Sequence, residues 1–232
     1  MMTDALRARR LTRRGLTITI LGLLGLAAVY LLALRYTPTE RFQGLPQKIF
    51  YIHVPAAWSA LLAFSLVGIA SILYLWLRDP RLDRFADSTA AVGLVFSLVM
   101  LTTGPLWGKP VWGTWWTWDA RLTFTLILFF LFLGYRALRG ALQDPGERAR
   151  FSAVLGIFGL VLVPFVHVTV YLFRTLHPQP IVLKPSEPSL PWVMLRTLLL
   201  SAGCFTVLLI GFVTTRYGLA AQASVQGGED AG

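Results

Sequence analysis

Six long apolar runs dominate the sequence and constrain its fold more than any other feature. Each is close to the roughly 20 apolar residues that an α-helix needs to cross the hydrocarbon core of a bilayer. The runs cover residues 16–34, 56–77, 88–106, 123–138, 152–173 and 192–214. Because a backbone inside lipid must satisfy its own hydrogen bonds, each run is expected to be helical. The sequence therefore predicts an all-α integral membrane protein with six transmembrane helices.

Composition supports this class and excludes several others. The chain is 56% hydrophobic and 14% charged, whereas soluble domains are about 25% charged. Its net charge of +10 comes from residues in short segments between the apolar runs, so a basic face for nucleic acid is not expected. The single cysteine, Cys204, lies inside the sixth run. Without a CxxC or CxxCH motif, the chain is expected to be neither a thiol oxidoreductase nor a c-type cytochrome.

The N-terminal region imitates a secretory signal peptide, because five arginines precede the first apolar run. The apolar part of a signal peptide is about 7–15 residues long and ends at a cleavage site of small residues. The first run is longer and leads into Leu34, Arg35 and Tyr36, so we interpret it as an uncleaved helix. The chain is expected to form one membrane domain over 1–221, with a disordered polar tail over 222–232.

The distribution of basic residues predicts the orientation of the helices. Positive residues in short connections are retained on the cytoplasmic side of a membrane. Of the 21 Lys and Arg residues, 13 fall on the side of the N-terminus and eight on the other side. Both termini are therefore predicted to be cytoplasmic. The connections 35–55, 107–122 and 174–191 are then predicted to face the outside.

The predicted outer side also collects the histidines and most of the tryptophans. His53 is expected at the outer mouth of the second helix, His177 just beyond the fifth, and His167 about two turns below that end. The connection 107–122 follows the one with His53 and precedes the one with His177. It contains Trp107, Trp112, Trp115, Trp116 and Trp118. Tryptophans at helix ends can form an aromatic belt in the headgroup region. Five within twelve positions favour a binding platform instead, and both interpretations remain open here.

A flat apolar ligand with a metal centre and acidic substituents would suit this surface, and heme has these properties. Heme needs axial donors, aromatic contact and cations for its propionates. His53 and His177 are candidate axial ligands to the iron. The cations available to the propionates are Lys109, Arg121 and Arg174.

Each of these residues also has a structural explanation. A single histidine at the membrane surface can simply form hydrogen bonds, and His167 is expected to be packed inside the membrane rather than to bind metal. Asp119 precedes the fourth run and fits the N-cap of a helix. It could cap that helix and also orient Arg121, so the two roles are compatible.

The same segments carry a resemblance to a known family. They read YIHVPAA at 51–57, WGKP at 107–110, WGTWWTWDARLT at 112–123 and TLH at 175–177. In these motifs and over nearly its whole length, the chain closely resembles cytochrome c maturation protein C, a branch of the tryptophan-rich WWD-motif heme-handling superfamily. The cytochrome c synthetase-type relatives carry Trp-Asp-Pro, whereas Asp119 here is followed by Ala120.

The resemblance implies a location, a ligand and partners. It implies that heme b is held at the periplasmic face of the bacterial inner membrane, with His53 and His177 as axial ligands and the tryptophans around them. It implies delivery to a periplasmic heme chaperone, cytochrome c maturation protein E. The implied assembly contains the ABC transporter subunits, proteins A and B, and the small membrane protein D. The chain would then be a handling subunit rather than an enzyme.

Two alternative functions remain open at this point. A transporter that moves heme across the bilayer is expected to carry ionisable residues within its spans, and here His167 and the end-proximal Arg196 are the main examples. A heme lyase-type synthetase is expected to have a large outer domain that presents the cysteines of its substrate. The predicted outer connections are short, which favours heme delivery over both alternatives.

Overall fold

Six long helices make up almost the whole chain in the computed structural model, which describes residues 2–182 and 184–229. They are α1 (Met2–Arg35), α2 (Phe50–Leu77), α3 (Pro80–Trp112), α4 (Ala120–Ala141), α5 (Pro145–Leu172) and α6 (Trp192–Glu229), with the 3₁₀ helix η1 (Leu45–Ile49) before α2. All six are long and apolar enough to cross a membrane. The described residues contain no strand. The predicted all-α membrane protein with six helices is confirmed.

The helices extend beyond the apolar runs. Because η1 and α2 begin at Leu45 and Phe50 and α3 continues to Trp112, the first two outer connections contain less irregular chain than the predicted 35–55 and 107–122. An apolar run shows which residues lie in lipid. The helix can continue beyond that run until a capping residue or a turn ends it. For α3 that stop is Gly113, whose φ of 76° lies in the left-handed region that favours glycine.

The C-terminal tail also differs from expectation. The disorder predicted from residue 222 is replaced by helix, because α6 runs to Glu229. The Gln222 amide donates hydrogen bonds to Thr12 Oγ1 at 2.7 Å and to the Gly218 carbonyl at 3.3 Å. These contacts tie the end of α6 to α1. Residues 230–232 of the predicted tail lie outside the described residues.

Close packing through small side chains joins the helices. In lipid the hydrophobic effect does not drive helices together, so close contact through glycine is favoured. A Cβ atom at Gly211 would meet Thr19 backbone atoms within 3.0 Å, which shows how closely α6 approaches α1. At the centre, the rings of Phe64 and Phe132 stack with centroids 3.9 Å apart and join α2 to α4.

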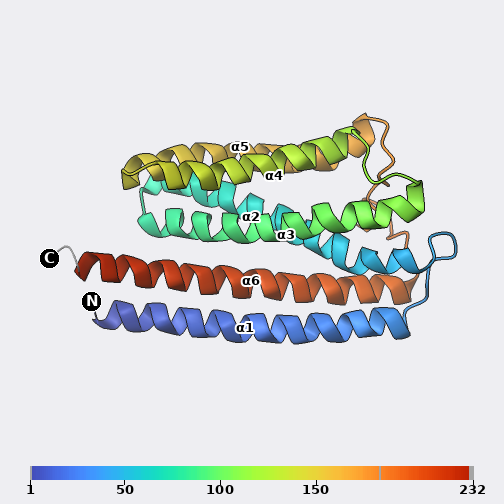
Figure 1. Cartoon of the computed structure of the whole chain (residues 1–232), viewed down its shortest axis with the longest axis horizontal. Coiled ribbons are helices and arrows are strands. Elements are labelled where there is room, and N and C mark those ends of the chain that lie inside the picture. The colour runs from blue at the N-terminus through green and yellow to red at the C-terminus, as the bar shows by residue number, and fades with distance from the viewer. Residues whose placement is uncertain (1, 183, 230–232) are drawn as a thin grey trace.

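The two ends of the bundle are built from different connections (Figure 1). Both termini lie at one end, together with the tight turns between α2 and α3 and between α4 and α5. The three connections that the sequence predicts to be outward, now 36–49, 113–119 and 173–191, lie at the opposite end. Residues far apart in the sequence are thereby brought together there.

The excess of basic residues predicts that the terminal end faces the cytoplasm. In a Cys204→Ser background, an impermeant thiol reagent added to intact spheroplasts is expected to label Ser186→Cys. Gln143→Cys, exposed in the α4–α5 turn, should react only after permeabilisation, because positive connections stay inside. The reverse labelling pattern would contradict this orientation.

Candidate functional site

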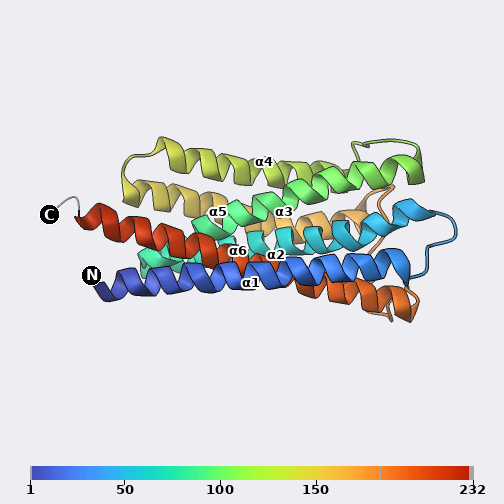
Figure 2. The same cartoon turned by 60° about the horizontal axis from the view of Figure 1, so that its bottom comes forward.

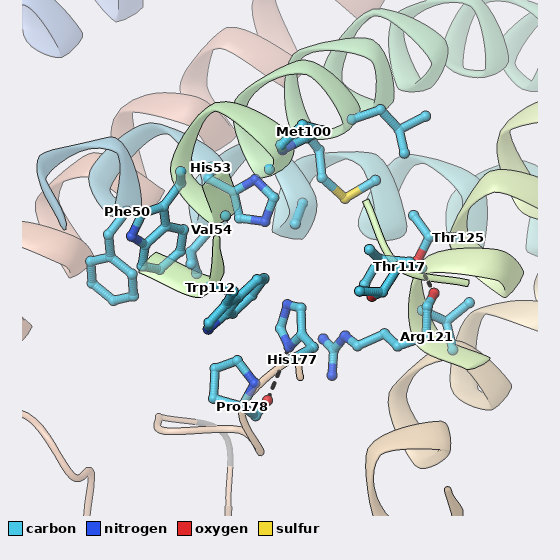
Figure 3. A pocket seen from close by; sticks show the side chains of 18 of the residues that line it. Phe50, His53, Val54, Met100, Trp112, Thr117, Arg121, Thr125, His177 and Pro178 are labelled. Carbon is cyan, nitrogen blue, oxygen red and sulfur yellow. Dashed lines mark hydrogen bonds between the residues drawn. The ribbon is translucent and has the colours of Figure 1, made fainter. Parts of the chain in front are cut away.

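A large cavity opens at the end of the bundle opposite the termini. It lies between α2, α3, α4 and α5 and is covered in part by the connections 113–119 and 173–191. Including its mouth, the empty space measures about 1440 Å³. Its lining is mainly apolar and aromatic, with a few polar side chains that converge on one space (Figure 3). This combination is typical of a site for a small organic ligand.

His53 lies in the first turn of α2 and is oriented by α3. Its Nδ1 atom is 3.1 Å from Thr103 Oγ1, which also lies 2.7 Å from the Val99 carbonyl. Because the hydroxyl donates its proton to that carbonyl, its oxygen accepts one from Nδ1 of His53. The Nε2 atom is then unprotonated and able to bind a metal. Gly104 makes room for the ring, since a Cβ atom there would lie 3.1 Å from His53 Cε1.

His177 reaches the same cavity from the connection 173–191. Its Nδ1 atom donates a hydrogen bond to the Pro178 carbonyl at 3.0 Å, and its backbone N–H donates to Thr175 Oγ1 at 3.0 Å. A carbonyl can only accept, so Nε2 again carries the free lone pair. Burial, reinforced by the positive charge of Arg121, lowers the pKa of His177 from 6.5 to about 4. The ring is therefore neutral at pH 7.

Three tryptophans form walls around the two imidazoles. The ring of Trp107 lies 5.8 Å from that of His53, and its Nε1 donates to Gln43 Oε1 at 3.0 Å. The ring of Trp112 lies 6.5 Å from that of His177. Trp116 also lines the cavity, and its buried Nε1 has no hydrogen-bond partner among the residues described. A buried donor without a partner is costly unless a ligand supplies one.

Arg121 places a positive charge in this apolar lining. It lies in the first turn of α4, and its guanidinium extends toward His177 (Figure 3). Its Nη1 atom is buried and finds no hydrogen-bond partner within 2–182 and 184–229. A buried cation with unused donors favours an anionic group on the ligand, for which a carboxylate is well matched.

The other predicted site residues lie close to the cavity but do not line it. Asp119 caps α4, accepting from Leu122 N at 3.1 Å and from Thr117 Oγ1 at 3.0 Å. Lys109 donates to the Gly113 carbonyl at 2.9 Å and so helps to end α3. Trp118 is 76% exposed and packs edge-on against Trp116, and Arg174 is also exposed. Direct ligand contact by these residues therefore stays a prediction.

The cavity is also lined by Trp115, a predicted ligand contact that is 56% exposed. It further contains residues that the sequence reasoning did not select. His167, expected to be packed between helices, lines its deeper part together with Met100. Phe50 lies three positions before His53, and this helical spacing could have identified it as a neighbour.

The sequence of this chain is similar to those of known proteins of one family. A family model described as heme exporter protein C matches residues 2–225. The chain belongs to the heme exporter protein C family. The match covers α1 to α5 and α6 as far as residue 225, and it includes the residues that line the cavity.

Individual members of the heme exporter protein C family match over most of their length. The heme exporter protein C of Bradyrhizobium diazoefficiens is 40% identical over 200 residues, which cover 84% of this chain and 76% of that protein. The Haemophilus influenzae protein of the same name is 37% identical over 197 residues, covering 85% and 79%. The one from Escherichia coli K12 is 36% identical over 172 residues, covering 72% and 70%.

Arg121→Gln is expected to raise the pKa of His177 from about 4. The pKa should not return fully to 6.5, because burial is the larger cause of the shift. An NMR titration of the labelled imidazole in the ligand-free protein would measure it. Arg174→Gln, which changes an exposed arginine near the site, is the control and should leave the pKa unchanged.

The lowered pKa of His177 also makes the stability of the protein depend on pH. Between about pH 6.5 and 4, the unfolded chain takes up a proton at residue 177 that the folded chain does not. The free energy of unfolding should therefore fall as the pH falls through this window, and by less in Arg121→Gln. Equal losses in the variant and in the parent protein would contradict the assigned role of Arg121.

Proposed function

We propose that this chain binds heme b in the cavity and delivers it to a periplasmic heme chaperone during c-type cytochrome biogenesis. The observation that carries the proposal is the pair of histidines. His53 and His177 come from separate elements, both line one cavity, and both use Nδ1 for hydrogen bonds to the protein. Both therefore keep Nε2 for a metal, the arrangement typical of metal-binding histidines.

The composition of the site favours heme over a bare metal ion. A structural or catalytic zinc ion is held by three or four protein ligands, and the described residues contain no cluster of three or more His, Cys, Asp or Glu side chains. Two imidazoles suit an iron that arrives with its own four ring nitrogens. Bound there, heme would supply the iron for axial ligation.

The aromatic and basic residues fit the rest of a heme. Trp107, Trp112 and Trp116 would contact the macrocycle, whose apolar faces suit tryptophan rings. Arg121, with its unused buried donors, would pair with a propionate. Trp116 Nε1 is a second donor that is available to a polar group on the ligand.

The excess of basic residues at the terminal end supports an inner-membrane orientation with the cavity toward the periplasm. Related proteins are named heme exporter protein C, which supports a role in a heme-export assembly. The resemblance described above extends this to ABC transporter proteins A and B, protein D and the chaperone protein E. We propose a handling role without bond-forming chemistry, because the cavity presents ligands and walls rather than a platform for a protein substrate.

His53→Gly and His177→Gly are each expected to convert heme in the purified protein from a six-coordinate to a five-coordinate spectrum. Each change removes one strong-field ligand, and added imidazole should restore the six-coordinate spectrum by filling the vacated position. His167→Gly is the matched control and should keep the parent spectrum. Unchanged spectra in both single variants would exclude His53 and His177 as the ligands.

Trp112→Ala and Trp116→Ala are each expected to weaken heme retention by about 1 to 3 kcal/mol, or roughly 5-fold to 150-fold, because each removes a ring that lines the cavity. Heme per protein after challenge with an acceptor protein would measure the loss. Trp192→Ala, at an exposed position at the start of α6 and outside the cavity lining, should retain heme at close to the parent level. If all three variants kept the parent level of heme, the tryptophans would be a membrane belt and not a heme platform.

A further inference from the structure

A second cavity lies at the end of the bundle that holds both termini, far from the histidines. It is bordered by α2, α3, α4, α5 and α6, and its empty space, including the mouth, measures about 1240 Å³. Among the residues that the structure describes, its charged lining consists of five arginines and two aspartates. The cavity therefore carries an excess of positive charge.

Both aspartates are already neutralised by arginines of α4. Arg139 binds Asp83 through two hydrogen bonds of 2.6 and 2.9 Å and also reaches Asp87 at 2.8 Å. Arg136 pairs with the same Asp87. This network joins α3 to α4, and Arg216 of α6 adds a further positive charge close to Arg136.

The remaining three arginines of the lining have no carboxylate partner in the described parts of the chain. Arg84 is held by a 3.0 Å hydrogen bond to Ser224 Oγ and lies 5.7 Å from the ring of Tyr217. Arg78 lies 5.9 Å from the ring of Tyr74. The Nε atom of Arg148 is buried without any hydrogen-bond partner in 2–182 and 184–229. Such contacts position guanidinium groups but do not neutralise them.

We propose that this cavity binds the phosphate of an anionic lipid headgroup. Guanidinium groups match phosphate oxygens with paired hydrogen bonds, and basic pockets between membrane helices on the cytoplasmic side are suited to anionic headgroups. The neighbouring surface is apolar, because Trp76, Leu77 and Leu219 are exposed beside the lining residues Arg78 and Ala220. Acyl chains can lie on that surface while the headgroup occupies the cavity, which favours a lipid over a soluble phosphate.

This proposal differs from a purely topological role for the arginines. Positive residues that only orient the helices act by their number on one side of the membrane, so their exact positions matter little. A binding site depends on the residues that line it. Arg150 provides the comparison, because it belongs to α5 like Arg148 but is exposed, lies outside the lining and donates to the Gly146 carbonyl.

The test measures lipid retained by the purified full-length protein, using native mass spectrometry after exchange into phosphatidylglycerol or phosphatidylcholine. The parent protein is expected to retain phosphatidylglycerol selectively. Arg84→Gln and Arg148→Gln should each reduce this retention by about fivefold, and Arg150→Gln should not. Arg84→Lys and Arg148→Lys, which keep the charge, should retain more than the Gln variants.

The outcomes separate the alternatives. Equal retention in Arg148→Gln and Arg150→Gln would overturn the site, as would equal retention of the two lipids by the parent protein. Displacement of the lipid by millimolar inorganic phosphate would overturn the lipid assignment in favour of a soluble phosphate. Thermal unfolding in neutral detergent should be the same for both Gln variants and the control, and a lower transition in Arg148→Gln alone would assign that arginine to stability.

Discussion

The need of a backbone to satisfy its own hydrogen bonds in lipid governs the rest of this structure. It forces the membrane-spanning segments into six helices. Irregular backbone is left only at the two ends of the bundle. The connections 113–119 and 173–191 can leave the helical conformation because they lie at one of these ends. Because irregular backbone is excluded from the membrane interior, these two connections meet at the same end, and their side chains can converge there.

The two ends use this freedom in opposite ways. At the end with the histidines, the cavity is walled by aromatic rings, and Arg121 brings a charge with unused donors into it. At the other end, an ion-pair network of α3 and α4 links the helices, and further arginines surround it. Apolar walls suit a flat hydrophobic ligand, whereas clustered guanidinium groups suit oxyanions. The two ends thus differ in the chemistry of the ligands that they are suited to bind.

Sequence reasoning predicted the helices well because apolarity reports directly on lipid. It also predicted that His53, His177 and the tryptophans share one end, since helix count alone decides which connections meet. It could not predict which of them face the cavity. Within the single motif 107–121, Trp112 and Arg121 line it, whereas Lys109, Trp118 and Asp119 do not. That choice depends on the backbone of the turn at Gly113 and on helix caps, which apolarity does not encode.

The two imidazoles are held by parts of the chain that differ in stiffness. His53 belongs to a helix and is fixed by Thr103 of its neighbour, whereas the hydrogen bonds of His177 are to Thr175 and Pro178 of its own connection. Withdrawing His177 requires only a rearrangement of that connection, but withdrawing His53 requires α2 to move against α3. Under the proposed function, the two histidines would therefore release the ligand in a fixed order. His177 would leave first, and His53 would stay bound until the recipient protein binds the ligand.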